Sequence, residues 1–302
     1  MWTQIQYALI YGWIKLHALL PMSVLYVLSD FLYFIVYRVI RYRVSVVRRN
    51  LKAAFPGKSN KELLLLEKKF YHHFADYVVE TLKLAHISLE ELQKRAYVQN
   101  PELIDQLMDK GNPCCLLLMG HFGNWEWYSG STSRFKDACL YQIYRPLNNK
   151  AVDKLFIHLR TKFGSFGIPK NDTGREVVRL VRNKVRSAVI FLADQTPSPS
   201  NLHYWTNFLN QDTAILTGAE RLARKLNTPV VFLDVQMLER GYYTLEMQLI
   251  TDNPKETPEN WITEEYARRM EKSILRKPEG WLWTHKRWKY KRSDAVTHHG
   301  NN

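Results

Sequence analysis

Short apolar runs alternate with helical patterns between residues 114 and 236, and this alternation constrains the fold more than any other feature. The run 114–119 is apolar throughout, and a strand predicted over 187–193 has the same character, as expected of strands buried on both faces. Further strand patterns occur at 140–144, 228–233 and 242–250. The sequence therefore predicts an α/β domain whose mixed sheet of about five to seven strands is flanked by helices.

A histidine and a glutamate follow the first apolar run, five residues apart, at His121 and Glu126. On a regular helix their side chains would point roughly 140° apart, so they meet only if the backbone turns at Gly120 and Gly123. Asn124 suits the cap of a helix that begins at the next residue. A carboxylate that holds an imidazole fixes its tautomer and raises its basicity. The pattern predicts acyl transfer to a hydroxyl, with His121 as general base and Glu126 orienting it; the alternative is an unrelated surface pair.

Five stretches resemble the late acyltransferases of lipid A biosynthesis, the lauroyl and myristoyl transferase family, which are relatives of the glycerolipid acyltransferases. Together they span nearly the whole chain in the family's order. They are Arg48-Arg49-Asn50-Leu51 with Phe55-Pro56, the box Gly120 to Glu126, Tyr144-Arg145-Pro146-Leu147-Asn148-Asn149, Asp194-Gln195, and Trp281 to Lys289. The resemblance implies a glycerolipid-acyltransferase-like fold and transfer of a fatty acyl chain from an acyl carrier protein thioester to a hydroxyl of a lipid A precursor. It implies neither a cofactor nor a metal.

The resemblance and the chemistry of the side chains together name six candidates for oxyanion or substrate binding. Arginine at a strand end suits an anionic group, and a polar pair at the carboxyl end of a parallel strand lies where open α/β sheets bind ligands. Backbone N–H groups near the first turn suit an oxyanion. The simpler alternatives are a surface ion pair and a turn before proline. The six candidates are Gly123, Asn124, Arg145, Arg175, Asp194 and Gln195.

Two segments of the C-terminal half carry further expectations. Residues 195–213 read as a long loop, in which Phe208-Leu209-Asn210 stands where the family often has Phe-Phe-Gly. Asparagine tolerates the left-handed backbone that glycine would supply, so the turn is expected to persist. His285 is either a second catalytic group or, more simply, a structural hydrogen-bonding residue.

The N-terminus is the most apolar part of the chain, and Pro21 divides it into two runs. The second run approaches the ~20 residues that span a bilayer, but Asp30 would cost roughly 2.5–3.5 kcal/mol at mid-bilayer. The sequence leaves a spanning helix, an interfacial hairpin and a buried helix pair open. Basic residues between Arg38 and Lys52 indicate the cytoplasmic side of the bacterial inner membrane. We expect an anchor at 1–40, an acyltransferase domain at 41–290 and a disordered tail at 291–302.

The formal net charge of +14 limits the classes of partner. An acidic acyl carrier protein, a phosphorylated lipid A precursor and inner-membrane phospholipids fit such a surface, and no nucleic-acid motif is visible. The three cysteines have no metal-binding spacing. The sequence leaves open the acyl chain length, the acylated position, and coenzyme A as the donor. Two other functions also stay open: an acyltransferase for an aminolipid or glycolipid, and a non-catalytic binder of anionic lipid or nucleic acid.

Overall fold

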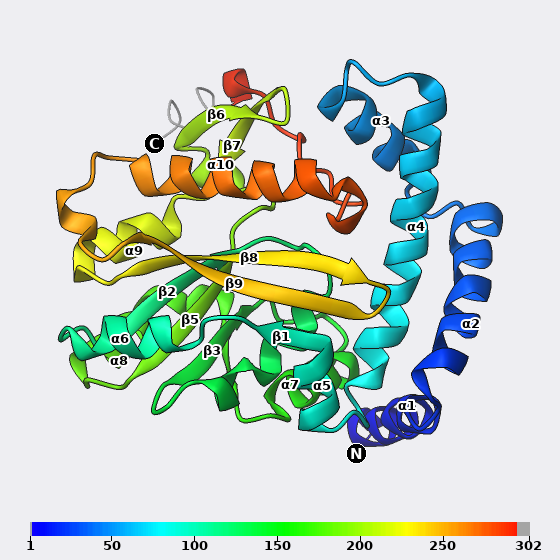
Figure 1. Cartoon of the computed structure of the whole chain (residues 1–302), viewed down its shortest axis with the longest axis horizontal. Helices are drawn as coiled ribbons and strands as arrows, with labels where there is room; N and C mark the ends of the chain where they lie inside the picture. Colours follow the sequence, from blue (N-terminus) through cyan, green and yellow to red (C-terminus); the bar gives the residue numbers. More distant parts are fainter. Residues whose placement is uncertain (1, 295–302) are drawn as a thin grey trace.

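The computed structural model describes residues 2–294, and within them the chain forms a seven-stranded, mostly parallel sheet and a separate two-stranded hairpin (Figure 1). The predicted fold class is confirmed. The sheet has the order β1-β9-β8-β2-β5-β3-β4. Its strands are β1 Ala96–Val98, β2 Cys114–Met119, β3 Cys139–Tyr144, β4 Phe166–Pro169, β5 Ser187–Leu192, β8 Val230–Glu239 and β9 Tyr242–Thr251.

Helices cover both faces of the sheet. In the view of Figure 1, α10 lies above the sheet and α5 and α7 lie below it, while the long α4 runs along one end. A capping box between Ser59 and Glu62 starts α4, as the sequence predicts. The helices are α1 Trp2–Ala18, α2 Met22–Tyr33, α3 Val44–Ala54, α4 Asn60–Lys83, α5 Leu89–Arg95, α6 Glu102–Asp109, α7 Lys150–Thr161, α8 Thr173–Arg182, α9 Gly218–Leu226 and α10 Trp261–Arg276.

The central strand β2 is buried along its whole length and pairs in parallel with β5 on one side and β8 on the other. Its last residue, Met119, lies opposite Leu192, the last residue of β5. The N–H of Ala193 still donates to the carbonyl of Met119, at 3.1 Å. Because the two strands end at the same level, the residues that follow them emerge side by side at one edge of the sheet. This register positions the candidate site.

The segment predicted as a long loop contains an antiparallel hairpin, so that prediction is wrong in its second half. Strands β6 (Tyr204–Phe208) and β7 (Gln211–Ile215) pair across a two-residue turn. Both turn residues, Leu209 and Asn210, have φ values of 52° and 61°, the left-handed backbone of a tight hairpin turn. Asn210 thus takes the conformation predicted for it. Neither strand alternates between buried and exposed residues, so the sequence carries no period-two signal for this hairpin.

The N-terminal segment folds onto the body as two helices. Helix α2 lies alongside α4 on the side away from the sheet (Figure 1) and continues into a π-helix, Phe34–Val39. Among residues 2–294, Met22–Val39 is the one helix long and apolar enough to cross a membrane, and about a fifth of it (22%) is buried. The proposed tail at 291–302 falls mostly outside the described residues, so its predicted disorder stays a prediction.

Candidate active site

His121 is the second residue after β2 and follows Gly120, which packs closely against Met270 and Asp194. A Cβ on Gly120 would lie 2.5 Å from both Sδ and Cε of Met270 and 3.3 Å from the carboxylate carbon of Asp194. Glycine therefore allows the chain after β2 to pass close to the chain after β5. The imidazole of His121 keeps 14% of its side chain exposed, at the wall of a cavity.

Asp194 holds both the backbone and the side chain of His121. One carboxylate oxygen lies 2.7 Å from Nδ1 of the imidazole, and the other accepts the backbone N–H of His121 at 2.9 Å. The carboxylate is almost fully buried. Because Asp194 accepts at Nδ1, the neutral imidazole carries its proton there and presents the Nε2 lone pair to the cavity. This is the arrangement of a histidine general base with an orienting carboxylate.

Electrostatics keep Asp194 ionised. Burial by itself would raise the pKa of this carboxyl, but the imidazole of His121, the His121 backbone N–H and the indole of Trp281 outweigh it and lower the pKa to about 2. The carboxylate therefore carries its charge at every pH at which His121 could act as a base. A permanent negative charge at Nδ1 stabilises the imidazolium that forms when Nε2 accepts a proton.

The C-terminal segment locks this pair from a second direction. The indole N–H of Trp281 donates to Asp194 at 2.8 Å, and the N–H of Leu282 donates to the carbonyl of His121 at 3.1 Å. An antiparallel bridge joins Phe122 to Trp281. The stretch that begins at Trp281, one of the five that carry the family resemblance, thus contributes directly to the geometry of the histidine.

A cavity of about 670 Å³ opens beside Nε2 of His121. The side-chain amide of Gln195 lies 3.2 Å from Nε2, which makes it the polar group closest to the reacting nitrogen. The ring of Trp125 meets the imidazole edge-on at 5.0 Å. The cavity wall is otherwise largely apolar, and this part is made by Ile143, Phe156, Ile157, Ile190, Leu192 and Leu216. A cavity of this size and polarity suits a hydrocarbon chain beside a base.

The predicted contact between Glu126 and His121 is not the one the structure has. Glu126 is buried and forms a two-pronged ion pair with Arg160 of α7, with N–O distances of 2.7 and 2.6 Å. The carboxylate on His121 is that of Asp194 instead. The physical reason is local: a 3₁₀ helix, Trp125–Arg134, starts directly after the turn and directs Glu126 toward α7. Both Glu126 and Arg160 still line the cavity.

The predicted oxyanion donors near the turn are already bonded within the protein. The N–H of Gly123 donates to the carbonyl of Gly280 at 2.9 Å, so it is not available to a substrate. The side chain of Asn124 is buried and donates to Glu80 at 2.9 Å, away from the cavity lining. Gly123 itself has a φ of 61°, and this left-handed turn is where glycine is required. Both residues therefore shape the turn, and neither lines the cavity.

The two predicted arginines lie in different places. Arg145 lines the cavity from the end of β3, and within residues 2–294 its guanidinium has no hydrogen-bond or ion-pair partner. Arg175 lies on α8 outside the cavity lining, is 76% exposed, and pairs with Asp172 at 2.7 Å. Lys170 lines the cavity in its place. The structure thus brings Arg145 to the site and leaves Arg175 on the surface.

His285 also lines the cavity, and its Nε2 accepts the backbone N–H of Thr196 at 3.0 Å. Burial lowers the pKa of this imidazole to about 4, a direction that the cation of Arg287 also favours although Asp194 opposes it. His285 is therefore neutral near pH 7. With its Nε2 engaged by the main chain, it has the structural role that the sequence analysis gave as the simpler option.

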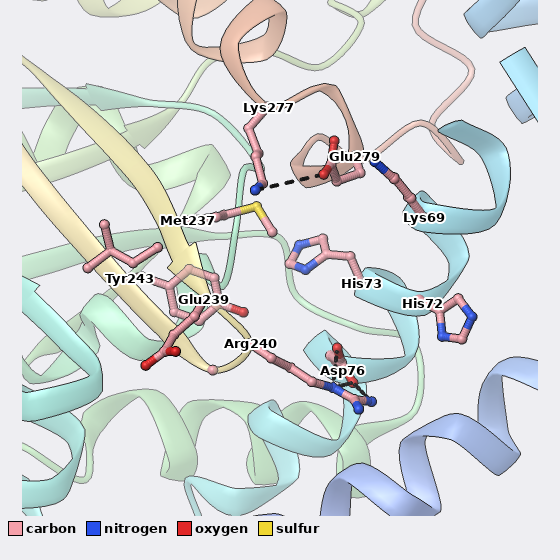
Figure 2. Close-up of a pocket in the computed structure, with 12 residues that line it drawn as sticks. Lys69, His72, His73, Asp76, Met237, Glu239, Arg240, Tyr243, Lys277 and Glu279 are labelled. Carbon is pink, nitrogen blue, oxygen red and sulfur yellow. Dashed lines mark hydrogen bonds and ion pairs between the residues drawn. The ribbon is translucent and has the colours of Figure 1, made fainter. Parts of the chain in front are cut away.

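A second cavity, of about 350 Å³, lies between α4 and the β8–β9 turn (Figure 2). His73 points into this cavity. Two pairs of charged side chains in the cavity wall bind each other. Arg240 binds Asp76 at 2.6 Å, and Lys277 lies 4.0 Å from Glu279. His72 at this cavity lies 4.0 Å from Asp30, too far for a hydrogen bond, whereas Asp194 holds His121 at 2.7 Å, so the cavity beside His121 is the candidate active site.

Sequence reasoning missed three contributors to this site. Asp194 was a candidate for substrate binding and not for the partner of His121. Arg160 and Trp281 were not singled out for the site at all. The signal for Asp194 was present, since two buried parallel strands that end level place their following residues together, but the register between them is not visible in the sequence.

The comparison with known families covers almost the entire chain. A family described as Bacterial lipid A biosynthesis acyltransferase matches residues 2–290. No curated protein matches the chain. The matched range includes every residue of the site described above.

Proposed function

Because this chain belongs to the bacterial lipid A biosynthesis acyltransferase family, we propose that it moves a fatty acyl chain from a carrier thioester to a hydroxyl of a lipid A precursor. The observation that carries the proposal is the His121–Asp194 pair at the wall of a largely apolar cavity. A base that is fixed in one tautomer beside room for a hydrocarbon chain suits acyl transfer to an alcohol.

In the proposed reaction, Nε2 of His121 accepts the proton of the acceptor hydroxyl as its oxygen attacks the thioester carbon. The carbon–sulfur bond then breaks, and the imidazolium returns the proton to the leaving thiolate. The products are an ester and a free thiol, so atoms and charge balance. Asp194 orients the imidazole and stabilises its charged form throughout. General base catalysis of this kind contributes roughly 10²–10⁴-fold to the rate.

The side-chain amide of Gln195 is our candidate for stabilising the oxyanion of the tetrahedral intermediate. Its nitrogen lies 3.2 Å from Nε2, within reach of an oxygen that occupies the neighbouring position. In the free enzyme this amide fills the place of the substrate hydroxyl at Nε2, so it must turn when substrate binds. The sequence predicts the backbone N–H of Gly123 as an oxyanion donor, but this N–H already donates to the carbonyl of Gly280. We therefore assign the role to Gln195.

Cationic side chains at the cavity suit the charged parts of the substrates. Arg145 and Lys170 line it, and the formal net charge of the chain is +14. Such a surface attracts an acidic acyl carrier protein over a long range and also suits the phosphates of a lipid A precursor. Coenzyme A is the competing donor, because it presents the same thioester arm.

Glu126 acts, in this proposal, through Arg160 and not through His121. The ion pair fixes the guanidinium in the cavity wall and joins the 3₁₀ helix after the turn to α7. Burial favours the neutral form of Arg160, but the adjacent carboxylate of Glu126 raises its pKa, so the guanidinium stays charged. A direct Glu126–His121 dyad would require this pair to break when substrate binds.

The apolar N-terminal helix and the arginines near its end support a proposal for where the enzyme lies in the cell. An apolar N-terminal helix in a family that acts on lipid A is consistent with membrane association. We place the catalytic domain on the cytoplasmic side of the inner membrane, because the exposed Arg38 lies at the end of the apolar helix and the exposed Arg41 and Arg49 come after it.

The direct test is mass spectrometry of a purified lipid A precursor incubated with the protein and an acyl donor. The proposal predicts that the precursor gains the mass of one acyl chain with the wild-type protein and not with His121→Ala. Acyl carrier protein and coenzyme A thioesters are compared as donors, and a phospholipid and an aminolipid serve as alternative acceptors. Acylation of one of these alternatives but not of the precursor would overturn the assigned acceptor.

A further inference from the structure

We propose that helices α1 and α2 bind a lipid bilayer from one side only, lying along the membrane surface with their outer apolar side chains in the lipid and without crossing it. The inference deepens the proposed function, on which it rests only for the lipid nature of the acceptor. It chooses between the spanning and interfacial arrangements that the sequence leaves open.

The outer sides of α1 and α2, with the π-helix that follows, carry large apolar side chains that nothing in the protein covers. Leu9 is 70% exposed, Val27 68% and Phe31 62%. Within α1, the exposed apolar residues recur every three or four positions, which places them along one side of the helix. A monomeric soluble protein rarely exposes so extended an apolar surface. The set comprises Trp2, Ile5, Leu9, Trp13, Leu16, Leu19, Val24, Val27, Leu28, Phe31, Phe34, Val39 and Ile40.

The inner face of α2 is attached to α4 through polar contacts along its length. Tyr26 donates to Glu80 at 3.0 Å and Ser29 to Asp76 at 2.6 Å. One turn of helix further on, Tyr33 stacks on His72. These contacts continue at both ends of the helix.

At the turn between α1 and α2, the ammonium of Lys83 donates to the carbonyls of Ala18 and Leu20 at 2.7 and 2.8 Å. At the far end of the apolar segment, Tyr37 donates to the buried Glu67 at 2.7 Å. Helices α1 and α2 are therefore a fixed part of the domain and do not pack independently in lipid.

Asp30 makes a crossing arrangement unfavourable. It lies at the middle of the apolar helix Met22–Val39 and pairs with Arg240 at 2.6 Å. Figure 2 shows that Arg240 reaches Asp76 on α4 from the β8–β9 turn, with a neighbouring N-terminal helix beside this pair. If α2 crossed the bilayer, this half-exposed charged pair would lie at mid-membrane, and the folded body attached to it would have to follow. Along the surface, the same charges stay in water.

Charge and position favour a bilayer as the occupant of this face. Exposed cations lie within or shortly after the same apolar segment of the chain, as expected of a surface that meets anionic head groups. A second copy docked by the same face would bring two such cationic segments together. Helix α1 also packs on α7, where Tyr11 contacts His158, and α7 contributes Phe156 and Arg160 to the cavity. These exposed cations include Lys15, Arg38, Arg41, Arg43 and Arg49.

Vesicle flotation tests the surface. The full-length protein is mixed with vesicles of phosphatidylglycerol and phosphatidylethanolamine, and the bound fraction is compared between Val27→Gln/Phe31→Gln and the wild type. We expect at least a tenfold weaker affinity. The matched control, Trp261→Gln/Leu275→Gln, removes two exposed apolar side chains from α10 and is expected to bind as the wild type does. Equal binding by all three proteins would overturn the proposal, as would a loss of self-association without any loss of vesicle binding.

Cysteine labelling distinguishes lying on the membrane from crossing it. Ser23→Cys and Ser45→Cys place a thiol at either end of the apolar helix at exposed positions, in a Cys139→Ala background where the remaining cysteines are buried. An impermeant maleimide is applied to spheroplasts and to inverted membrane vesicles. Labelling of both positions from the same side is the expected result, and labelling from opposite sides overturns the proposal. His121→Ala should bind vesicles normally, so failure of the proposed chemistry leaves this test intact.

Discussion

Among the single residues, Asp194 does the most to define the chemistry, because it accepts three hydrogen bonds around one imidazole. The backbone and side chain of His121 and the indole of Trp281 all point at its two oxygens. A buried carboxylate with this many donors is strongly biased toward its charged form. The consequence is a histidine with one defined tautomer before any substrate arrives.

The lowered pKa of Asp194, about 2, predicts how this residue contributes to stability as pH changes. A carboxyl whose pKa is lower in the folded than in the unfolded state, where it is near 3.9, stabilises the fold above the unfolded value and loses this effect as pH falls through the folded value. We therefore expect the free energy of unfolding of wild type to exceed that of Asp194→Asn by roughly 2 kcal/mol at pH 7. The difference between the two free energies of unfolding should decrease as the pH falls from about 4 to 2. Urea titrations across this range measure it, and a gap that widens toward low pH would contradict the assignment.

The Glu126–Arg160 pair leads to a second prediction at this scale. Glu126→Gln leaves the guanidinium without its carboxylate, and because Arg160 is partly exposed we expect a loss of roughly 1–3 kcal/mol in stability, below the cost of breaking a fully buried pair. Adding Arg160→Gln should recover part of this loss, since the unpaired charge is removed as well. Thermal unfolding of the four proteins in the cycle measures the coupling. Strictly additive losses would show that the pair does not act as a unit.

At the scale of secondary-structure elements, the sequence predicts β2, β3, β5, β8 and β9 but neither β1, β4 and the β6–β7 hairpin nor the order in which the strands pair. Continuous apolar runs identified β2 and β5, and a capping box identified the start of α4. The register that sets Met119 opposite Leu192 depends on packing between strands far apart in the chain. For that reason the sequence paired His121 with Glu126, its neighbour along the chain, while the fold pairs it with Asp194.

The turn between β2 and the following 3₁₀ helix is the part of the site that we expect to be most sensitive to substitution. Gly123→Ala puts a side chain into a left-handed backbone and brings its Cβ within 3.0 Å of Val235 and 3.2 Å of Tyr243. We expect stability to fall by about 1–2 kcal/mol from the backbone alone, and acyl transfer to fall with it, because the turn carries His121. Gly174→Ala is the matched control, since its Cβ would meet nothing within 4 Å and its φ is ordinary. If both variants unfold at the same temperature as the wild type, the turn is not strained in the way described.

At the scale of the whole molecule, the N-terminal helices and the catalytic body form one folded unit. Composition alone made residues 1–40 look like a separable anchor followed by a soluble domain. The structure attaches them instead through the buried Glu67, Asp76, Glu80 and Lys83 of α4, a set that no sequence pattern connects to the anchor. The apolar face was predictable from the sequence, and the polar attachment was not.

This arrangement predicts that deleting residues 1–40 damages the fold and does not simply release a soluble enzyme. The deletion uncovers polar groups of α4 that lose their partners, and each such loss is costly. We expect aggregation, or a melting temperature lower by several degrees in detergent, measured by scanning fluorimetry. Val27→Gln/Phe31→Gln keeps the inner contacts and should melt as the wild type does. A truncated protein that is monodisperse and equally stable would contradict the single-unit description.

The measurement that tests the central claim most directly is the rate of single-turnover acyl transfer in a double-mutant cycle around His121. If Asp194 works only through the imidazole, Asp194→Asn should lower the rate by roughly 10³–10⁴-fold, and adding it to His121→Ala should cost almost nothing more. Glu126→Gln, acting through Arg160, should instead lower the rate by the same factor with or without His121. The opposite result would contradict the account. In that case, Glu126→Gln would not lower the rate of the His121→Ala variant any further, whereas Asp194→Asn would. The orienting role would then belong to Glu126.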